Sequence, residues 1–309
     1  MNDEIQSVPL GKLILLILLG VMAIGFSIGW ILSLARKRKE GIRPSLFQLL
    51  IGFVTDFLDT WGVGSFATTT ALFRLGKVVD DDKIPGTLNV GHTLPTILQA
   101  IIYINVVEID LWTLWILIIS SLVGSYVGAT FVCRLSKKGI QWGMGIALLI
   151  AVSLMVAKLC GLIPSGGNAL GLNGISLVIG MVGNFVFGAL MMIGIGAYAP
   201  IMIMVSLLGM NQTVAFPLMM GSCAILMPVA SYRFISSGKY DTRAALGLTL
   251  FGLPAVALAA WIVTGLPPAY LSWLVVVVVI YTAVTMLYSA SQPEAQPTKS
   301  IELVQGDVA

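Results

Sequence analysis

Nine long runs of apolar residues alternate with short polar loops along this chain of 309 residues. Each run has about the 20 residues that an α-helix needs to cross the hydrocarbon core of a bilayer, or more. Two runs are longer than the others, and each is interrupted midway by a Gly-x-Gly motif, in the stretches WGVGSFA and IGIGAYA. The pattern therefore predicts an all-α membrane protein, a polytopic helical bundle. The runs span residues 13–34, 46–73, 86–106, 112–133, 140–162, 174–208, 213–235, 243–265 and 270–290.

The composition supports membrane insertion and excludes several other classes of protein. Hydrophobic residues make up 58% of the chain, charged residues make up 10%, and the mean hydropathy is +0.98, whereas soluble domains carry about 25% charged residues. The three cysteines, Cys133, Cys160 and Cys223, lie in apolar runs and form no CxxC motif, so neither a disulfide framework nor a thiolate metal site is expected. No nucleic-acid-binding motif is visible, and the first apolar run is too long for a signal peptide. The polar tail, 291–309, is expected to be disordered.

The two interrupted runs belong to a weak internal repeat. When the sequence is shifted by 132 positions, Gly62 and Gly64 fall on Gly194 and Gly196. The proline that opens the next predicted helix also matches a proline in the second copy. Because internal repeats determine architecture, we divide the chain accordingly. The predicted units are a first transmembrane repeat (1–139), a second transmembrane repeat (140–268), and a last helix with a polar cytoplasmic tail (269–309).

The distribution of basic residues indicates how the two interrupted runs sit in the membrane, because lysine and arginine collect in cytoplasmic loops. If all nine runs crossed the membrane, the basic residues would be divided between its two sides. If 46–73 and 174–208 are instead re-entrant hairpins, 15 of the 17 lysines and arginines lie inside, and only Lys12 and Lys158 lie outside. We therefore predict about seven full crossings and two broken-helix hairpins, with the N-terminus outside and the C-terminus in the cytoplasm.

Three crossings and one hairpin in each repeat would invert the second copy relative to the first. The two hairpin tips would then meet near the membrane midplane, where transporters built from inverted repeats bind their substrates. Each tip exposes backbone N–H groups of the half-helix that follows it, and these groups and the helix dipole favour an anion. We expect the four glycines to form this site, with side-chain donors from Ser65, Thr68 and Tyr198. The alternative is that the glycines only allow helices to pack closely.

Two acidic residues, Asp56 and Asp59, lie deep in the first interrupted run. An ionisable side chain in a membrane segment is costly and marks a candidate functional site. One or both could carry a coupling proton, or they could bind a coupling cation. Equally, they could brace the turn by accepting hydrogen bonds from backbone N–H groups. The second repeat has Gly188 and Met191 at the matching positions, so any proton or cation site is asymmetric.

The only histidine, His92, lies on a polar stripe in the run 86–106. Helical spacing places the stripe on one face, which is expected to face the bundle interior rather than lipid. We regard Asn89 and His92 as candidate substrate-binding residues. A lone histidine is more often a hydrogen-bonded interior residue, and a role as a proton relay is the second interpretation. The stripe comprises Asn89, His92, Thr93, Thr96, Gln99 and Tyr103.

Small residues recur every four positions in the run 112–133. They are Ser120, Gly124 and Gly128, in the stretch SSLVGSYVGA. Such spacing suits close packing against another transmembrane helix, so this run is predicted to contact a neighbour at short range.

These features resemble the sulfite exporter TauE/SafE family of bacterial permeases. The resemblance covers residues 13–290 and is strongest in the second hairpin, GNFVFGALMMIGIGAYAPIMIMVSLLGM, where Pro200 follows the turn. The first hairpin departs from the family pattern, because WGVGSFATT lacks a third consecutive glycine and the following proline, and adds Asp56 and Asp59. The resemblance implies a permease fold and the movement of small anions, including sulfite and organosulfonates.

The sequence thus predicts a secondary transporter of a small anion in the bacterial cell membrane, such as sulfite, an organosulfonate or another small organic acid. Asp56 or Asp59 would carry a coupling proton, and no cofactor or metal is expected. Neither a P-loop nor a nucleic-acid partner is indicated. One alternative is a divalent-cation transporter that uses Asp56, Asp59 and His92, whose side chains are of the kind that metals bind. A second alternative is an intramembrane hydrolase with a Ser65–His92 dyad, although the second repeat has Ala197 in place of Ser65.

Overall fold

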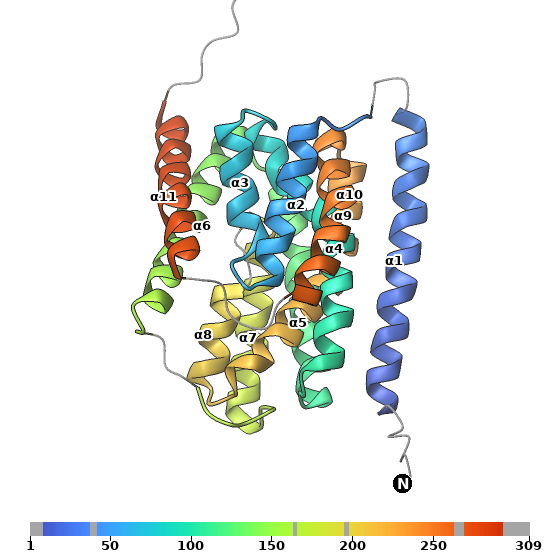
Figure 1. Cartoon of the computed structure of the whole chain (residues 1–309), viewed down its shortest axis with the longest axis vertical. Coiled ribbons are helices and arrows are strands. Elements are labelled where there is room, and N and C mark those ends of the chain that lie inside the picture. The colour runs from blue at the N-terminus through green and yellow to red at the C-terminus, as the bar shows by residue number, and fades with distance from the viewer. Residues whose placement is uncertain (1–8, 38–41, 163–165, 195–197, 263–268, 293–309) are drawn as a thin grey trace, which may run out of the picture.

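The computed structural model describes residues 9–37, 42–162, 166–194, 198–262 and 269–292. Within these ranges the chain forms eleven α-helices and two short 3-10 helices, and apart from two isolated bridges it contains no strand. Figure 1 shows an upright bundle with α1 at its edge. The α-helices are α1 (Leu10–Lys37), α2 (Leu46–Thr60), α3 (Ser65–Leu75), α4 (Ile84–Val106), α5 (Leu111–Val132), α6 (Lys137–Leu159), α7 (Gly174–Met191), α8 (Tyr198–Leu207), α9 (Ala215–Ser236), α10 (Thr242–Ile262) and α11 (Ala269–Ser291); the 3-10 helices are η2 (Asp81–Lys83) and η3 (Gln212–Val214).

Several helices begin at a side-chain cap that the sequence provides. At the start of α2, the Ser45 Oγ accepts a hydrogen bond from the Gln48 N–H, and the Gln48 Oε1 accepts one from the Ser45 N–H at 2.8 Å, which is a capping box. At the start of α5, the Asp110 Oδ2 accepts a hydrogen bond from the Thr113 N–H at 2.8 Å. Such caps satisfy amide groups that helical hydrogen bonding leaves free, so local sequence determines where these helices begin.

Within the described residues, six helices are long and apolar enough to cross a membrane. Five of them, α1, α5, α6, α9 and α10, coincide with predicted crossings. The sixth, α7, lies in the run that we predicted to form the second hairpin. Helix α4 is not among the six, because its polar stripe lowers its mean hydropathy, and of α11 only Val279–Ser291 is found, as a shorter apolar helix. The chain is therefore a helical membrane protein, and the number of full crossings stays a prediction.

The first interrupted run forms a helix–turn–helix unit, α2 and α3. Between these helices Gly62 and Gly64 have φ angles of 83° and 92°, in the region that favours glycine. The Phe47 ring, at the start of α2, lies so close to Gly76, just after α3, that a Cβ on Gly76 would overlap it. The unit therefore begins and ends at the same end of the bundle, and α2 and α3 lie in the upper half of Figure 1.

The second interrupted run has the same form, built from α7 and α8. The helix α7 is followed by Gly194, with a φ of 102°, while Gly196 lies outside the described residues. The segment before α7 pairs with the segment after α8, since the Asn211 N–H donates to the Ala169 carbonyl at 2.9 Å. This unit also begins and ends at one end of the bundle, and it lies in the lower half of Figure 1.

The helices pack in a pattern of matched pairs. Helix α2 packs against α10, as α7 packs against α5. Helix α4 packs against α10, as α9 packs against α5, and α4 and α9 pack against each other at the centre. Helix α6 packs against α11. Exchanging the series α2–α6 for the series α7–α11 converts α2–α10 into α7–α5 and α4–α10 into α9–α5, and it leaves the α4–α9 and α6–α11 contacts unchanged. Helix α1 has no counterpart in either series.

The predicted close packing of α5 is confirmed, and its partner is α7. A Cβ on Gly124 would overlap the Phe185 carbonyl group, and a Cβ on Gly128 would lie against the backbone of Ala189. The Ser120 hydroxyl donates a hydrogen bond to the Met181 carbonyl at 2.6 Å. Small side chains thus bring the two helix backbones into direct contact.

Candidate functional site

A chain of three buried polar side chains connects α2, α3 and α4 beside the first helix break. The Asp56 Oδ1 lies 2.7 Å from the His92 Nδ1, and the His92 Nε2 lies 3.0 Å from the Thr69 Oγ1. All three residues are fully buried. An ionised carboxylate can only accept hydrogen bonds, so when Asp56 is charged the His92 Nδ1 carries the donated proton. The neutral ring then accepts at Nε2 from the Thr69 hydroxyl, while the imidazolium would donate to it.

The second oxygen of Asp56 lies against α10. The Oδ2 atom is buried and has no hydrogen-bond partner among the described residues. A Cβ at Gly252 would overlap this oxygen, so the absence of a side chain at Gly252 makes room for the carboxyl group. The sequence analysis did not identify Gly252, because nothing in a glycine inside an apolar helix indicates which side chain it faces.

Asp59 has a different environment from Asp56. Its Oδ1 accepts a hydrogen bond from the Ser65 N–H at 2.8 Å, at the first residue of α3. The N-cap residue of α3 is Gly64, which has no side chain to provide this bond. The carboxylate therefore caps α3 at the positive end of the helix dipole. This is the bracing role foreseen for the aspartates, and it occupies an amide that we expected to be available to an anion.

The hydroxyl groups after the first break are directed mainly to the backbone of their own helix. The Thr68 Oγ1 donates to the carbonyl groups of Gly64 and Ser65, at 2.9 and 2.8 Å. Ser65 and Thr68 are both buried. Thr69, which we did not select as a site residue, is the one whose hydroxyl contacts His92.

The polar stripe of α4 faces the bundle interior, as predicted. Beyond His92, the Gln99 Nε2 donates to the Thr60 Oγ1 at 3.0 Å, and the Tyr103 hydroxyl donates to the Thr60 carbonyl. Asn89 is fully buried, but its Nδ2 donates to the Pro85 carbonyl of its own helix. The stripe therefore holds the end of α2 through Thr60, and Asn89 is not joined to the Asp56–His92 pair.

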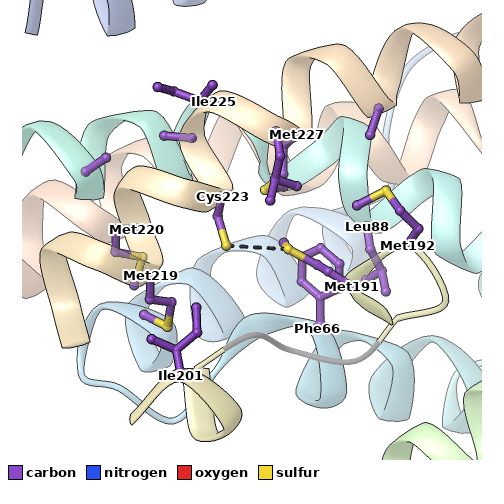
Figure 2. Packing of buried hydrophobic residues seen from close by; sticks show 14 of the residues in the cluster. Phe66, Leu88, Met191, Met192, Ile201, Met219, Met220, Cys223, Ile225 and Met227 are labelled. Atoms are coloured by element: carbon purple, nitrogen blue, oxygen red, sulfur yellow. Dashed lines mark hydrogen bonds between the residues drawn. The ribbon is translucent and has the colours of Figure 1, made fainter. Parts of the chain in front are cut away.

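The second helix break has sulfur-containing and aliphatic neighbours. Figure 2 shows Met191, at the end of α7, pointing toward Cys223 on α9; the Cys223 Sγ lies 3.4 Å from the Met191 Sδ. Phe66 of α3 belongs to the same extended hydrophobic core as Met191. At the position that matches Asp56, Gly188 lies against the Ser121 backbone. The predicted asymmetry between the two breaks is therefore present in the structure.

Two predicted site residues of the second break lie wholly or partly outside the described residues. Gly196 lies outside the described residues, and Tyr198 begins α8 but its side chain is also outside them. Gly194 is described, and a Cβ there would lie 2.9 Å from the Met144 side chain. The second break thus offers tight backbone packing at Gly194 and no described polar side chain equivalent to Asp56.

The chemistry that this arrangement supports is proton exchange on a buried acid–imidazole pair. In the parts of the chain that the structure describes, no group of three or more His, Cys, Asp or Glu side chains could hold a metal ion. Asp56 and His92 can share a proton across their 2.7 Å contact, whereas Asp59 is engaged at the Ser65 amide.

Comparison of the chain with protein-family models, with curated proteins and with solved structures found no match in any of the three. The fold and the buried Asp56–His92 pair identify the chain as a helical membrane protein with an ionisable pair in its interior. Function must therefore be inferred from the site itself.

Proposed function

We propose that the chain is a secondary transporter, a permease that moves a small anion across the cell membrane together with a proton. The observation that carries the proposal is the fully buried contact of Asp56 with His92, next to a helix break. Ionisable side chains inside membrane segments typically mark ion pathways and proton relays. Placing both groups away from water carries a desolvation cost, for which a role in proton transfer provides a functional reason.

The proposed architecture is a pair of inverted repeats with two re-entrant hairpins, seven full crossings, an outside N-terminus and a cytoplasmic C-terminus. Three observations support it: the matched helix contacts, the return of each broken-helix unit to the end where it began, and the position of the two units in opposite halves of Figure 1. The matched contacts pair α6 with α11, so we now place the end of the first repeat after α6 rather than at residue 139. The second repeat then includes α11.

The proposed substrate is a small anion such as sulfite, an organosulfonate or another small organic acid. The backbone N–H groups in the first turn of α3 that follow Ser65 provide the attraction, since a helix N-terminus favours negative charge and the Ser65 N–H itself is bonded to Asp59. The resemblance to TauE/SafE permeases points to the same substrate class. The substrate would meet residues of both breaks, whose neighbours Phe66 and Met191 belong to one cluster.

Charge balance explains how this site would couple the anion to a proton. With Asp56 ionised and His92 neutral, the pair carries one negative charge, which repels an anion bound nearby. One added proton makes the pair neutral overall, as a carboxylate beside an imidazolium. An anion therefore binds better to the protonated site, and by reciprocity the bound anion strengthens proton binding. The two would cross together.

The test is transport by the full chain in reconstituted vesicles, with sulfite as the probe, across a range of pH. We expect Asp56→Asn to abolish uptake driven by a proton gradient and to leave exchange of sulfite down its own gradient intact, because the amide keeps the shape but does not titrate. Asp59→Asn is the matched control, one helical turn away, because an amide oxygen can still accept from the Ser65 N–H. Identical pH profiles for wild type and Asp56→Asn, at equal protein levels, would rule out the role of Asp56.

The two alternative functions receive less support from the site. A divalent cation would need Asp59 together with Asp56 and His92, but Asp59 already accepts from the Ser65 amide. A hydrolase would need His92 beside Ser65, but the His92 Nε2 contacts Thr69. Substitution of Ser65 by alanine separates the cases, because it would abolish hydrolysis and only weaken transport.

A further inference from the structure

A groove between α1 and α9 lies outside the site described above. Its volume is about 670 Å³, within the range of pockets that hold small molecules. Helix α1 touches the bundle near Leu19 and again at Trp30, both buried. Between these contacts lie Gly25 and Gly29, at which an added Cβ would meet no atom within 4 Å. The groove thus exists because α1 lacks side chains where it passes α9.

The groove is polar at one end and apolar at the other. Its polar end is formed by the last turns of both helices, with Ser33 and Arg36 on α1 and Ser236 on α9. Its apolar end is formed by Met22 on α1 and Val229 on α9, together with their neighbours. At 1.5 Å per residue, the distance along α1 from Arg36 to Gly25 is roughly 16 Å. That is about half of a hydrocarbon core of about 30 Å, which is the depth of one leaflet.

The charge at the polar end indicates the kind of ligand. Arg36 is exposed and forms no ion pair or hydrogen bond with any described residue. In the sequence it begins the run Arg-Lys-Arg-Lys, 36–39, and basic residues directly beside a transmembrane helix attract anionic lipid headgroups. Trp30 also lines the groove, and its indole N–H has no hydrogen-bond partner among the described residues.

We propose that this groove binds one anionic phospholipid, with the phosphate at Arg36 and an acyl chain lying along Gly29 and Gly25 toward Val229. The lipid fills the space between α1 and the rest of the bundle and fixes α1 to α9. The proposal does not depend on the transport function, because it concerns how α1, which has no counterpart in either matched series, is attached to the bundle.

The test is native mass spectrometry of the purified full chain, delipidated in detergent and then titrated with phosphatidylglycerol or with phosphatidylcholine of the same acyl chains. We expect one retained adduct, with a clear preference for phosphatidylglycerol. Arg36→Ala should remove the preference, and Gly29→Leu should remove the adduct by filling the groove. Val229→Phe narrows the groove from the α9 side and should also remove the adduct. This variant keeps the test available if Gly29→Leu does not fold.

Two variants serve as matched controls. Arg43→Ala removes an exposed arginine outside the groove, and Gly20→Leu adds the same side chain to α1 at another position where a Cβ meets nothing within 4 Å. Both should keep the wild-type adduct and its preference. Equal retention of the two lipids by wild type, or an adduct that survives both Gly29→Leu and Val229→Phe, would overturn the proposal. A dimer that these substitutions dissociate, without change in lipid binding, would assign the groove to a second copy of the chain instead.

Discussion

Asp56 and Asp59 lie one turn apart in α2, and the fold gives them different partners. Asp56 contacts His92 on another helix, whereas Asp59 accepts from the N–H of Ser65, six residues further along the chain. The sequence identified all three ionisable residues as unusual for a membrane segment. It left the division of roles open, because the Asp56–His92 contact joins helices whose relative rotation no local pattern determines.

Gly252 provides a prediction at this scale. Its replacement by alanine would place a methyl group on the Asp56 Oδ2 and near Pro95, so the carboxyl group would be displaced from His92. Overpacking of this kind typically costs about 1–3 kcal/mol. We expect Gly252→Ala to lower the thermal unfolding temperature in detergent and to alter the pH dependence of sulfite transport.

The control for this prediction is Gly20→Ala, since a Cβ at Gly20 meets no atom within 4 Å. It should leave both measurements close to wild type. If Gly252→Ala behaves in the same way as the control, the contact between α10 and Asp56 does not position the carboxyl group.

At the scale of elements, glycines determine which helices approach each other most closely. The sequence predicted that α5 would pack at short range from the spacing of Ser120, Gly124 and Gly128. It could not predict that α7 is the partner, because the pattern describes only one surface of the contact. The same holds for α2 and α10, where a Cβ on Gly52 would lie 2.6 Å from the Leu248 Cα.

We predict that Gly124→Val separates α5 from α7. The added side chain would meet the Phe185 backbone, which cannot move aside as the end of a flexible side chain could. A polar contact of the same interface, from the Ser120 hydroxyl to the Met181 carbonyl, would be lost with it. Size-exclusion chromatography after detergent extraction should show aggregated rather than monodisperse protein. The matched control is Gly20→Val, because a Cβ at Gly20 meets no atom within 4 Å, and this variant should stay monodisperse. A monodisperse Gly124→Val variant would contradict the prediction.

At the scale of the whole molecule, the sequence predicted the helical membrane class from composition and the positions of both helix breaks from the Gly-x-Gly motifs. It placed α6 in the second repeat and α11 outside both repeats, because these helices carry no recognisable repeat motif, and we propose the other grouping from their contacts. Their pairing becomes visible only when the contacts of all helices are compared. Long-range helix contacts, unlike helix positions, are not encoded in any single stretch of the chain.

Two contacts at one end of the bundle support the proposed hairpin topology over nine crossings. The Lys239 Nζ lies 3.4 Å from the Asp82 Oδ2, which joins the loop before α10 to η2. Phe47 and Gly76 join the two ends of the α2–α3 unit. With nine crossings, Asp82 and Lys239 would be expected on opposite sides of the membrane, whereas two hairpins would place both in the cytoplasm.

The topology can be tested with single cysteines and an impermeant thiol reagent added to intact cells. One variant keeps the native Cys160, which is exposed at the end of α6, and lacks the other two native cysteines. Two further variants lack all three native cysteines and carry Lys77→Cys or Lys137→Cys. With two hairpins, Cys160 lies outside and should be labelled, whereas the cysteines at 77 and 137 lie inside and should react only after permeabilisation. With nine crossings, the basic loops at 77 and 137 lie outside and Cys160 lies inside, so the labelling pattern is reversed. Because the two topologies predict opposite results at all three positions, the reversed pattern would exclude the hairpins, and with them the shared site near the membrane midplane.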